Sequence, residues 1–430
     1  MLSYRLEFHP ESDEQFFEQL PSAPAVFALR GEQAQAEAYI SKTANLRRRA
    51  RRLLAQPANT TMPTSATDRQ MWGTRLNLRH RVRWLEYSPT GSDFESGFLL
   101  YKLWRHEFPE AYQKRLRLRP APLLRLILEN RYPRLVITTR IAGLHGRRSA
   151  ADGAFAFAPT RSAYYGPFPT RAAAEKFAND TLDLFKVRRC IEELDPDPAF
   201  PGCIYSEMKM CLAPCFRGCT DEAYAEEVAQ LEQFLASGGR SLLQAVAAER
   251  DRASEQLEFE TAAATHARFE RIQALTRELP EIVRRLDRLR GLMIQPSAQP
   301  GAVALFRIEE GRISDPITFA PAALAAFTPA GAATATAVSS AAPQSMEARL
   351  REAVASVPPA QLRSAQEAME HLAMLKRWYY RTYKVGELFL SDDRGELPMR
   401  RIVRGVARVL KGEAPPEDQG IGIRDLGFGI

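Results

Sequence analysis

The chain has 430 residues, of which 45% are hydrophobic and 26% are charged. This composition is that of a globular protein with roughly two to four domains of about 100–200 residues each, and it excludes a disordered or fibrous chain. The 59 lysines and arginines outnumber the 52 aspartates and glutamates, and the resulting net charge of +7 favours an anionic partner.

The N-terminal stretch MLSYRLEFHPESDEQFFEQL carries charges throughout and has no apolar core of signal-peptide length. No run of about 20 apolar residues occurs later in the chain. We therefore expect a cytoplasmic protein with no membrane partner, whose thiols stay reduced. Most of the cationic residues are arginines, and the planar fork of the guanidinium group suits phosphate binding. A GC-rich genome would also favour arginine over lysine.

The first predicted elements are two short strands followed by a basic helix. The apolar runs Ala25–Leu29 and Ala38–Ser41 flank a polar turn, which is typical of a β-hairpin. In residues 42–54 apolar side chains recur at helical spacing, and arginines occupy the other faces. A solvated helical face and a phosphate-binding face both fit this pattern. The candidate DNA-binding residues are Arg47, Arg48, Arg51 and Arg52.

A third strand is predicted at Val82–Tyr87 and a helix at Asp93–His106. The hairpin, basic helix, strand and helix follow one another in an order that resembles the GIY-YIG nuclease domain. More specifically, it resembles the N-terminal domain of the UvrC excinuclease family of bacterial nucleotide excision repair. This resemblance implies a small mixed α/β nuclease domain that acts on DNA.

The resemblance rests on two short motifs. The family's first motif, Gly-(Ile/Val)-Tyr, corresponds to residues 25–27, and Tyr-(Ile/Val)-Gly followed by Lys-Ala-x-Asn-Leu corresponds to residues 39–46. The family's nuclease residues would accordingly be Tyr39, Lys42 and Arg49 in this chain.

The match breaks at two positions that matter for catalysis. The family's first-motif tyrosine is Phe27 here, and its metal-binding glutamate falls on Leu100, which cannot ligate a hard cation. The resemblance therefore implies an impaired nuclease site. An active site that uses Mg²⁺ or Mn²⁺ would need a relocated carboxylate, such as Glu95 or Glu107.

All five cysteines lie between Cys190 and Cys219, and this clustering predicts a metal centre. Thiolates with this spacing can hold a structural zinc ion or an iron–sulfur cluster, with ordinary buried thiols and disulfides as alternatives. Residues 184–190 and 211–215 also resemble UvrC segments. That resemblance implies a [4Fe-4S] cluster, or alternatively Zn, on Cys190, Cys203, Cys211 and Cys215. Cys219 is extra, and would either replace one ligand or be idle.

A long helical pair is predicted over residues 241–290, and Leu257–Ala263 within it resembles the UVR motif Leu-Asp-Phe-Glu-Lys-Ala-Ala. We expect Phe259 and the alanines to lie where the two helices cross, as small residues do in any close helical pair. In the UvrC family this module contacts a matching hairpin on UvrB. The resemblance implies a UvrB-type partner that contacts Leu257, Phe259, Ala262 and Ala263.

The last third of the chain gives a weaker signal. A strand pair is predicted within residues 302–313, a flexible insert over 321–344, and helices at Met346–Val354, Pro359–Trp378 and Pro398–Leu410. Neither the aspartates of the RNase-H-like second nuclease of UvrC nor its helix–hairpin–helix repeats are found. The aromatic segment 378–384 suits base stacking, but aromatics that end a helix more often pack in a core.

The sequence thus predicts an α+β chain with a mainly helical C-terminal region. The expected units are an N-terminal extension (1–20), a GIY-YIG-like domain (21–118), a cysteine-rich region (119–236), a UVR-type hairpin (237–292) and a UvrC-homology remnant (293–430). Three functions remain open at this point. They are a UvrC-related DNA-binding repair protein with a decayed nuclease site, an active single-incision endonuclease, and a metal-containing interaction or regulatory protein.

Overall fold

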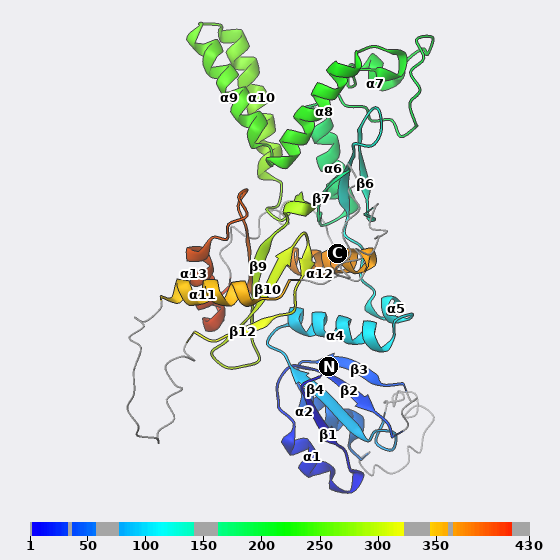
Figure 1. Ribbon diagram of the computed structural model, residues 1–430, viewed down its shortest axis with the longest axis vertical. Coiled ribbons are helices and arrows are strands. Elements are labelled where there is room, and N and C mark those ends of the chain that lie inside the picture. Colours follow the sequence, from blue (N-terminus) through cyan, green and yellow to red (C-terminus); the bar gives the residue numbers. More distant parts are fainter. Residues whose placement is uncertain are drawn as a thin grey trace, which may run out of the picture.

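The computed structural model describes residues 2–32, 37–56, 77–141, 162–321, 345–359 and 364–414. It contains three antiparallel sheets with helices packed against them, which confirms the predicted α+β class (Figure 1). None of the helices in these ranges is long and apolar enough to cross a membrane.

The first sheet has the strand order β1-β4-β2-β3 and lies at the bottom of Figure 1. Its strands are β1 (Tyr4–Glu7), β2 (Ala25–Arg30), β3 (Tyr39–Thr43) and β4 (Trp84–Pro89). One face packs against α1 (Asp13–Gln19), which follows the 3₁₀ turn η1 (Pro10–Ser12), and against α2 (Leu46–Leu54). The other face packs against α4 (Asp93–Glu107). We expected residues 1–20 to form an extension, but they supply β1 and α1 because Phe16, Phe17 and Leu20 join this core.

The second sheet has the order β6-β5-β7-β8. Its strands are β5 (Leu123–Ile127), β6 (Arg134–Thr138), β7 (Ala163–Gly166) and β8 (Arg284–Arg285). Helix α6 (Arg171–Leu182) packs against β5 and β6, and α8 (Asp221–Ala236) contacts β8. Helix α5 (Tyr112–Leu116) instead contacts α4, and α7 (Ile204–Glu207) and the 3₁₀ turn η2 (Pro214–Phe216) lie in the cysteine region. The N-cap of α8 is Thr220, whose hydroxyl accepts a hydrogen bond from Ala223 N–H.

Two antiparallel helices, α9 (Arg240–Glu255) and α10 (Phe259–Arg277), form the hairpin that projects at the top of Figure 1. Val246, Ala253, Ile272 and Leu275 are buried along this helix pair. The helical pattern predicted as far as residue 290 ends earlier. Residues 284–285 instead pair with β7, and the 3₁₀ turn η3 (Leu286–Arg288) follows.

The third sheet has the order β11-β10-β9-β13, and β12 also pairs with β10. Its strands are β9 (Gly291–Pro296), β10 (Val303–Glu309), β11 (Arg312–Ile313), β12 (Ile317–Phe319) and β13 (Glu387–Leu390). The helices of this region are α11 (Met346–Ser356), α12 (Ala365–Tyr379) and α13 (Met399–Lys411). The region is thus less purely helical than predicted, since β9 and β13 were missed. Residues 322–344 of the predicted insert lie outside the described residues.

Helix α4 lies between the first and third sheets and buries side chains toward both. Leu100 and Leu103 join the core under the first sheet. On another face of α4, the Phe94 ring lies 5.3 Å from the Phe306 ring of β10 and 6.1 Å from the Trp378 ring of α12. Burial of Trp378 confirms that this aromatic belongs to a core. One helix therefore joins the two halves of the chain.

A buried carboxylate completes this junction. Glu370 of α12 is only 5% exposed, and its carboxylate accepts hydrogen bonds from the hydroxyls of Tyr101 and Tyr112, each at 2.9 Å. Arg105 of α4 forms an ion pair with Glu367 one turn earlier. These contacts join residues more than 250 positions apart in the sequence.

We predict that Glu370→Ala lowers the free energy of unfolding by about 2–4 kcal/mol, because two buried phenols lose their acceptor. Urea denaturation followed by circular dichroism measures this loss. The control is Glu352→Ala, at an exposed position of α11, which should change stability by less than about 0.5 kcal/mol. Equal stability of the two variants would contradict the proposed role of the buried network.

Candidate functional site

Two of the predicted nuclease residues lie together on one face of the first sheet. Arg49 Nη2, on α2, donates a 2.8 Å hydrogen bond to the Tyr39 hydroxyl on β3. The Phe27 ring lies on the same face, 6.1 Å from the Tyr39 ring. The Asn45 side chain accepts a hydrogen bond from Arg48 N–H, which caps α2 and fixes where it begins. The hairpin and the basic helix are therefore arranged to hold Tyr39 and Arg49 as a pair.

Lys42 lies on the opposite face of the same sheet. Successive side chains of a strand point to opposite faces, so Lys42 shares a face with Ile40 and not with Tyr39. Its ammonium group forms an ion pair with Asp93 at the start of α4. Asp93 also accepts a hydrogen bond from Arg381 at 2.7 Å. Burial alone would raise the pKa of Asp93, but these two cations outweigh it and lower the pKa.

Leu100 also lies on this second face and is only 8% exposed. It packs with Val26, Ala28 and Ile40 in an apolar cluster between α4 and the sheet. A carboxylate at this position would be buried among apolar side chains, which is costly without a partner. The sheet thus separates Leu100 and Lys42 from the Tyr39–Arg49 pair.

The two carboxylates considered as replacements already have protein partners. The Glu95 carboxylate accepts a 2.7 Å hydrogen bond from Gly91 N–H at the start of α4, and burial raises its pKa. Glu107 receives two hydrogen bonds from the Arg30 guanidinium, at 2.8 and 3.1 Å, and these lower its pKa. Both side chains stabilise α4 and its contact with the sheet.

The four candidate DNA-binding arginines of α2 are not equivalent. Arg47 donates hydrogen bonds to the carbonyl oxygens of Leu20 and Glu18, at 2.8 and 3.1 Å, and so tethers α2 to the preceding segment. Arg51 forms a 2.9 Å ion pair with Glu14. The side chains of Arg48 and Arg52 are exposed and have no partner among the residues that the structure describes. These two arginines are the ones available to an external anion.

The cysteine region brings four thiols close enough to influence one another. Burial is the main reason that the pKa of the Cys211 thiol rises to about 11, and the charges of Cys190, Cys203 and Cys215 act in the same direction. Hydrogen-bond donors also point at sulfur, since Ala213 N–H lies 3.3 Å from Cys211 Sγ and Arg188 Nη1 lies 3.4 Å from Cys190 Sγ.

This donor set has the chemistry of a thiolate-bound metal or cluster, because a bound cation would offset the repulsion between thiolates. Across the described ranges, however, no three or more histidine, cysteine, aspartate or glutamate side chains are arranged to hold a metal ion. The four cysteines therefore interact electrostatically, but within the described residues they do not form a closed ligand shell. Cys219 is also near, since its charge interacts with that of Cys215.

Arg188, which the sequence analysis did not single out, supports this region from inside. It is one of the largest fully buried side chains. Its guanidinium donates hydrogen bonds to the carbonyls of Tyr132 and Glu192, at 3.0 and 2.7 Å, in addition to Cys190 Sγ. The sequence signal for this role was the position of Arg188, two residues before Cys190.

The UVR-like residues lie at the tip of the α9–α10 hairpin. Leu257 and Phe259 are each 70% exposed, and Leu257 has a left-handed backbone with φ of 62°. Phe259 was expected where the helices cross, but it is the first residue of α10 and does not pack between them. Ala262 is partly exposed and Ala263 is exposed nearby. Two large apolar side chains thus face solvent at the end of the projecting hairpin.

Residues 130–234 match the family described as "UvrC/Cho excinuclease, middle domain". Among curated relatives, "UvrABC system protein C" of Idiomarina loihiensis is 32% identical over 31% of this chain and 20% of its own length. Proteins of the same name from Symbiobacterium thermophilum and Methanothermobacter thermautotrophicus are 26% and 25% identical, over 68% and 69% of this chain. These matches confirm that the chain is UvrC-like.

The chain spans less than half the length of these relatives. It covers 42% of the Symbiobacterium thermophilum protein and 45% of the Methanothermobacter thermautotrophicus protein. No solved structure matches it significantly.

We predict that Arg188→Ala lowers the free energy of unfolding by about 2–4 kcal/mol, because two carbonyls and a sulfur lose a charged donor. Urea denaturation of the purified chain measures the change. Lys186→Ala removes the same charge from an exposed position two residues earlier, and should have little effect. If both variants unfold at the same urea concentration, Arg188 does not hold the cysteine region in place.

Proposed function

We propose that this chain is a DNA-binding protein of nucleotide excision repair whose GIY-YIG-type nuclease site is impaired, and that it acts with a UvrB-type partner. The observation that carries the proposal is the apolar burial of Leu100 in a chain with a UvrC/Cho-type middle region. The position that would supply a metal ligand is part of a hydrophobic core.

Hydrolysis of a phosphodiester needs an activated water and a metal ion that takes up charge at the phosphate. Loss of one preorganised electrostatic element typically costs two to three powers of ten in rate, or about 3–4 kcal/mol. Here the two replacement carboxylates are occupied, and Lys42 is paired with Asp93 on the far face of the sheet from Tyr39. We infer that Mg²⁺ and Mn²⁺ have a role in this chain only if its nuclease is active.

The Tyr39–Arg49 pair retains chemistry that orients a phosphate without cleaving it. The phenol and guanidinium are both hydrogen-bond donors, and Arg49 Nε is buried with no hydrogen-bond partner in the described part of the chain. Together with the exposed Arg48 and Arg52, this face of α2 suits contact with a DNA backbone.

The cysteine region is proposed to hold a structural centre, either a [4Fe-4S] cluster or zinc, on Cys190, Cys203, Cys211 and Cys215. When bound, such a centre would stabilise the loop that carries it, since binding free energy adds to folding free energy. The apolar hairpin tip at Leu257 and Phe259 is proposed as the contact for a UvrB-type protein. Exposed large apolar residues on a projecting element favour that use.

We predict that the purified chain binds duplex DNA and that Arg48→Gln/Arg52→Gln reduces the slope of log affinity against log salt concentration by about two. The reason is that each phosphate contact releases about 0.9 of a counterion from duplex DNA. Fluorescence anisotropy over a salt series measures both affinity and slope.

The control for this measurement is Arg268→Gln/Arg271→Gln, which removes the same charge from exposed positions of α10. An equal loss of slope in the two double variants would show that only net charge matters. A chain that binds no DNA at low salt would overturn the proposed function itself.

We predict that Phe259→Asp weakens binding to a purified UvrB-type protein at least tenfold, because it places a charge in an apolar contact. Its melting temperature should stay within about 2 °C of the wild type, because Phe259 does not pack between α9 and α10. Calorimetric titration and thermal unfolding provide the two readings.

Val385→Asp serves as the control, since it introduces the same charge at another exposed apolar position outside the hairpin. Unchanged affinity of Phe259→Asp would remove the hairpin tip from the interface.

A further inference from the structure

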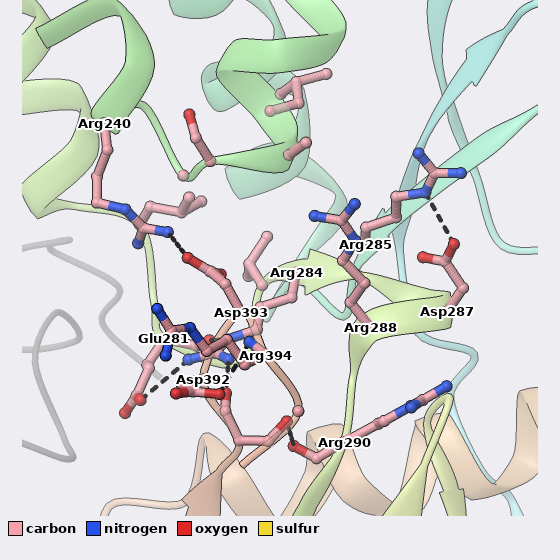
Figure 2. A pocket seen from close by; sticks show the side chains of 18 of the residues that line it. Arg240, Glu281, Arg284, Arg285, Asp287, Arg288, Arg290, Asp392, Asp393 and Arg394 are labelled. Atoms are coloured by element: carbon pink, nitrogen blue, oxygen red, sulfur yellow. Dashed lines mark hydrogen bonds and ion pairs between the residues drawn. The ribbon is translucent and has the colours of Figure 1, made fainter. Parts of the chain in front are cut away.

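A cavity of about 700 Å³ opens where the α8–α9 loop, the end of α10, β8 and the turn after β13 meet (Figure 2). Its lining comes from three separate parts of the sequence, within residues 235–240, 276–310 and 391–395. Six of the lining residues are arginines, namely Arg240, Arg284, Arg285, Arg288, Arg290 and Arg394. The segments that line the cavity lie well away from α2, where the hairpin joins the sheets (Figure 1).

Three of these arginines are neutralised by neighbouring carboxylates. Arg240 pairs with Asp393 at 2.5 Å. Arg284 pairs with Glu281 at 3.2 Å and also donates a 2.5 Å hydrogen bond to the Ser391 carbonyl, so it holds the turn after β13 in place. Arg285 pairs with both Asp287, at 3.1 Å, and Glu232, at 3.2 Å.

The remaining carboxylates of the lining are also occupied. Asp392 accepts hydrogen bonds from the backbone N–H groups of Arg394 and Glu396, at 2.9 and 2.8 Å, which shape the turn. Glu310 forms an ion pair with Arg312, which lies outside the lining. Within the described part of the chain, each carboxylate of the lining therefore already has an ion-pair partner or, for Asp392, two backbone hydrogen bonds.

Arg288, Arg290 and Arg394 are exposed and have no side-chain partner among the described residues. Figure 2 shows the Arg290 side chain extending away from the other labelled arginines, while Arg288 and Arg394 stay among them. The cavity thus keeps two surplus cations, both of them forked donors.

A buried hydroxyl provides an independent sign of a ligand. Tyr165 of β7 is 2% exposed, and its hydroxyl has no hydrogen-bond partner in the described part of the chain. Burial raises the pKa of Tyr165, and the charges of Arg285 and Arg288 oppose that shift, so both cations act on this phenol. Leaving a buried donor unmatched is unfavourable by about 1–3 kcal/mol.

Tyr165 lines a small, mostly apolar pocket that adjoins the arginine cavity and has room for about one water. The pocket has a volume of about 10 Å³, and it shares the lining residues Leu235, Gly238, Leu279 and Val283 with the larger cavity. Every carboxylate described at this junction already accepts an ion pair or a hydrogen bond. The side chains that have no partner there are therefore hydrogen-bond donors. The site consequently suits an anion with several acceptor oxygens.

We propose that this cavity binds a phosphate group of a nucleic-acid strand, with Arg288 and Arg394 as its charged donors and with the buried Tyr165 hydroxyl acting on it through one water in the adjoining small pocket. The guanidinium fork matches phosphate oxygens in pairs, and a cavity of this size accommodates a nucleotide. The identification of the phosphate with DNA rests on the proposed function. The site would position a strand passing from the first sheet toward the hairpin.

The test compares the wild type with Arg288→Gln/Arg394→Gln and with Tyr165→Phe, using a single-stranded oligonucleotide in fluorescence anisotropy. The double variant should bind at least tenfold more weakly, with a salt slope lower by about one to two. Tyr165→Phe keeps the charge and should weaken binding about threefold or more. Inorganic phosphate is the second probe. Its binding is measured as the rise in the melting temperature of the protein in phosphate relative to chloride at the same ionic strength.

The control is again Arg268→Gln/Arg271→Gln, which should retain wild-type oligonucleotide affinity more closely than the cavity variant. If phosphate raises the melting temperature of the wild type but not of the cavity variants, while oligonucleotide affinity is unchanged, the site binds a free phosphate and not a strand. That result would overturn the strand assignment.

If the cavity variants match the control with both probes, the cavity binds no phosphate and the proposal fails. In that case wild-type DNA binding, which the same titration records, still stands as a separate test of the proposed function. A Tyr165→Phe variant that is more stable but unchanged in binding would likewise show that the hydroxyl serves no ligand.

Discussion

Helix α4 is buried on two sides, and most of the structure depends on this constraint. One side packs under the first sheet through Leu100 and Leu103, and another packs on β10 and α12 through Phe94 and Phe98. A helix buried in this way has little room for an unpaired charge at its centre. Its acidic groups lie instead at its two ends, where Asp93 pairs with Lys42 and Arg381, Glu95 accepts from Gly91 N–H, and Glu107 pairs with the Arg30 guanidinium.

This burial explains why the nuclease-like features do not converge. The Tyr39–Arg49 pair lies on the face of the sheet covered by α1 and α2, while Lys42 and Leu100 lie on the face covered by α4. What remains exposed is spread over distant parts of the molecule: the cationic side of α2, the arginine cavity and the apolar hairpin tip. This distribution suits a protein that holds DNA and a protein partner at separate surfaces.

Local patterns predicted the elements near the motifs well. The hairpin, α2 and α4 were found from strand alternation and helical spacing, because those runs are continuous in sequence. Strands β9 and β13 were missed because β13 has only four residues and the two strands pair across about 90 residues. The segment 284–290 was expected to continue a helix, yet it forms β8, η3 and one wall of the cavity. No local pattern could place Arg394 and Arg288 in the lining of one cavity, since only the tertiary fold brings their segments together.

The central claim is that the chain binds DNA without an operative incision site, and a nicking assay tests it most directly. Purified protein is incubated with a damaged duplex, a UvrB-type partner and either Mg²⁺ or Mn²⁺, and the strands are separated on a denaturing gel. We expect intact strands, or a rate lower than that of an active family nuclease by about two or more powers of ten. A nick that appears with the wild type and disappears with Tyr39→Phe would contradict the account.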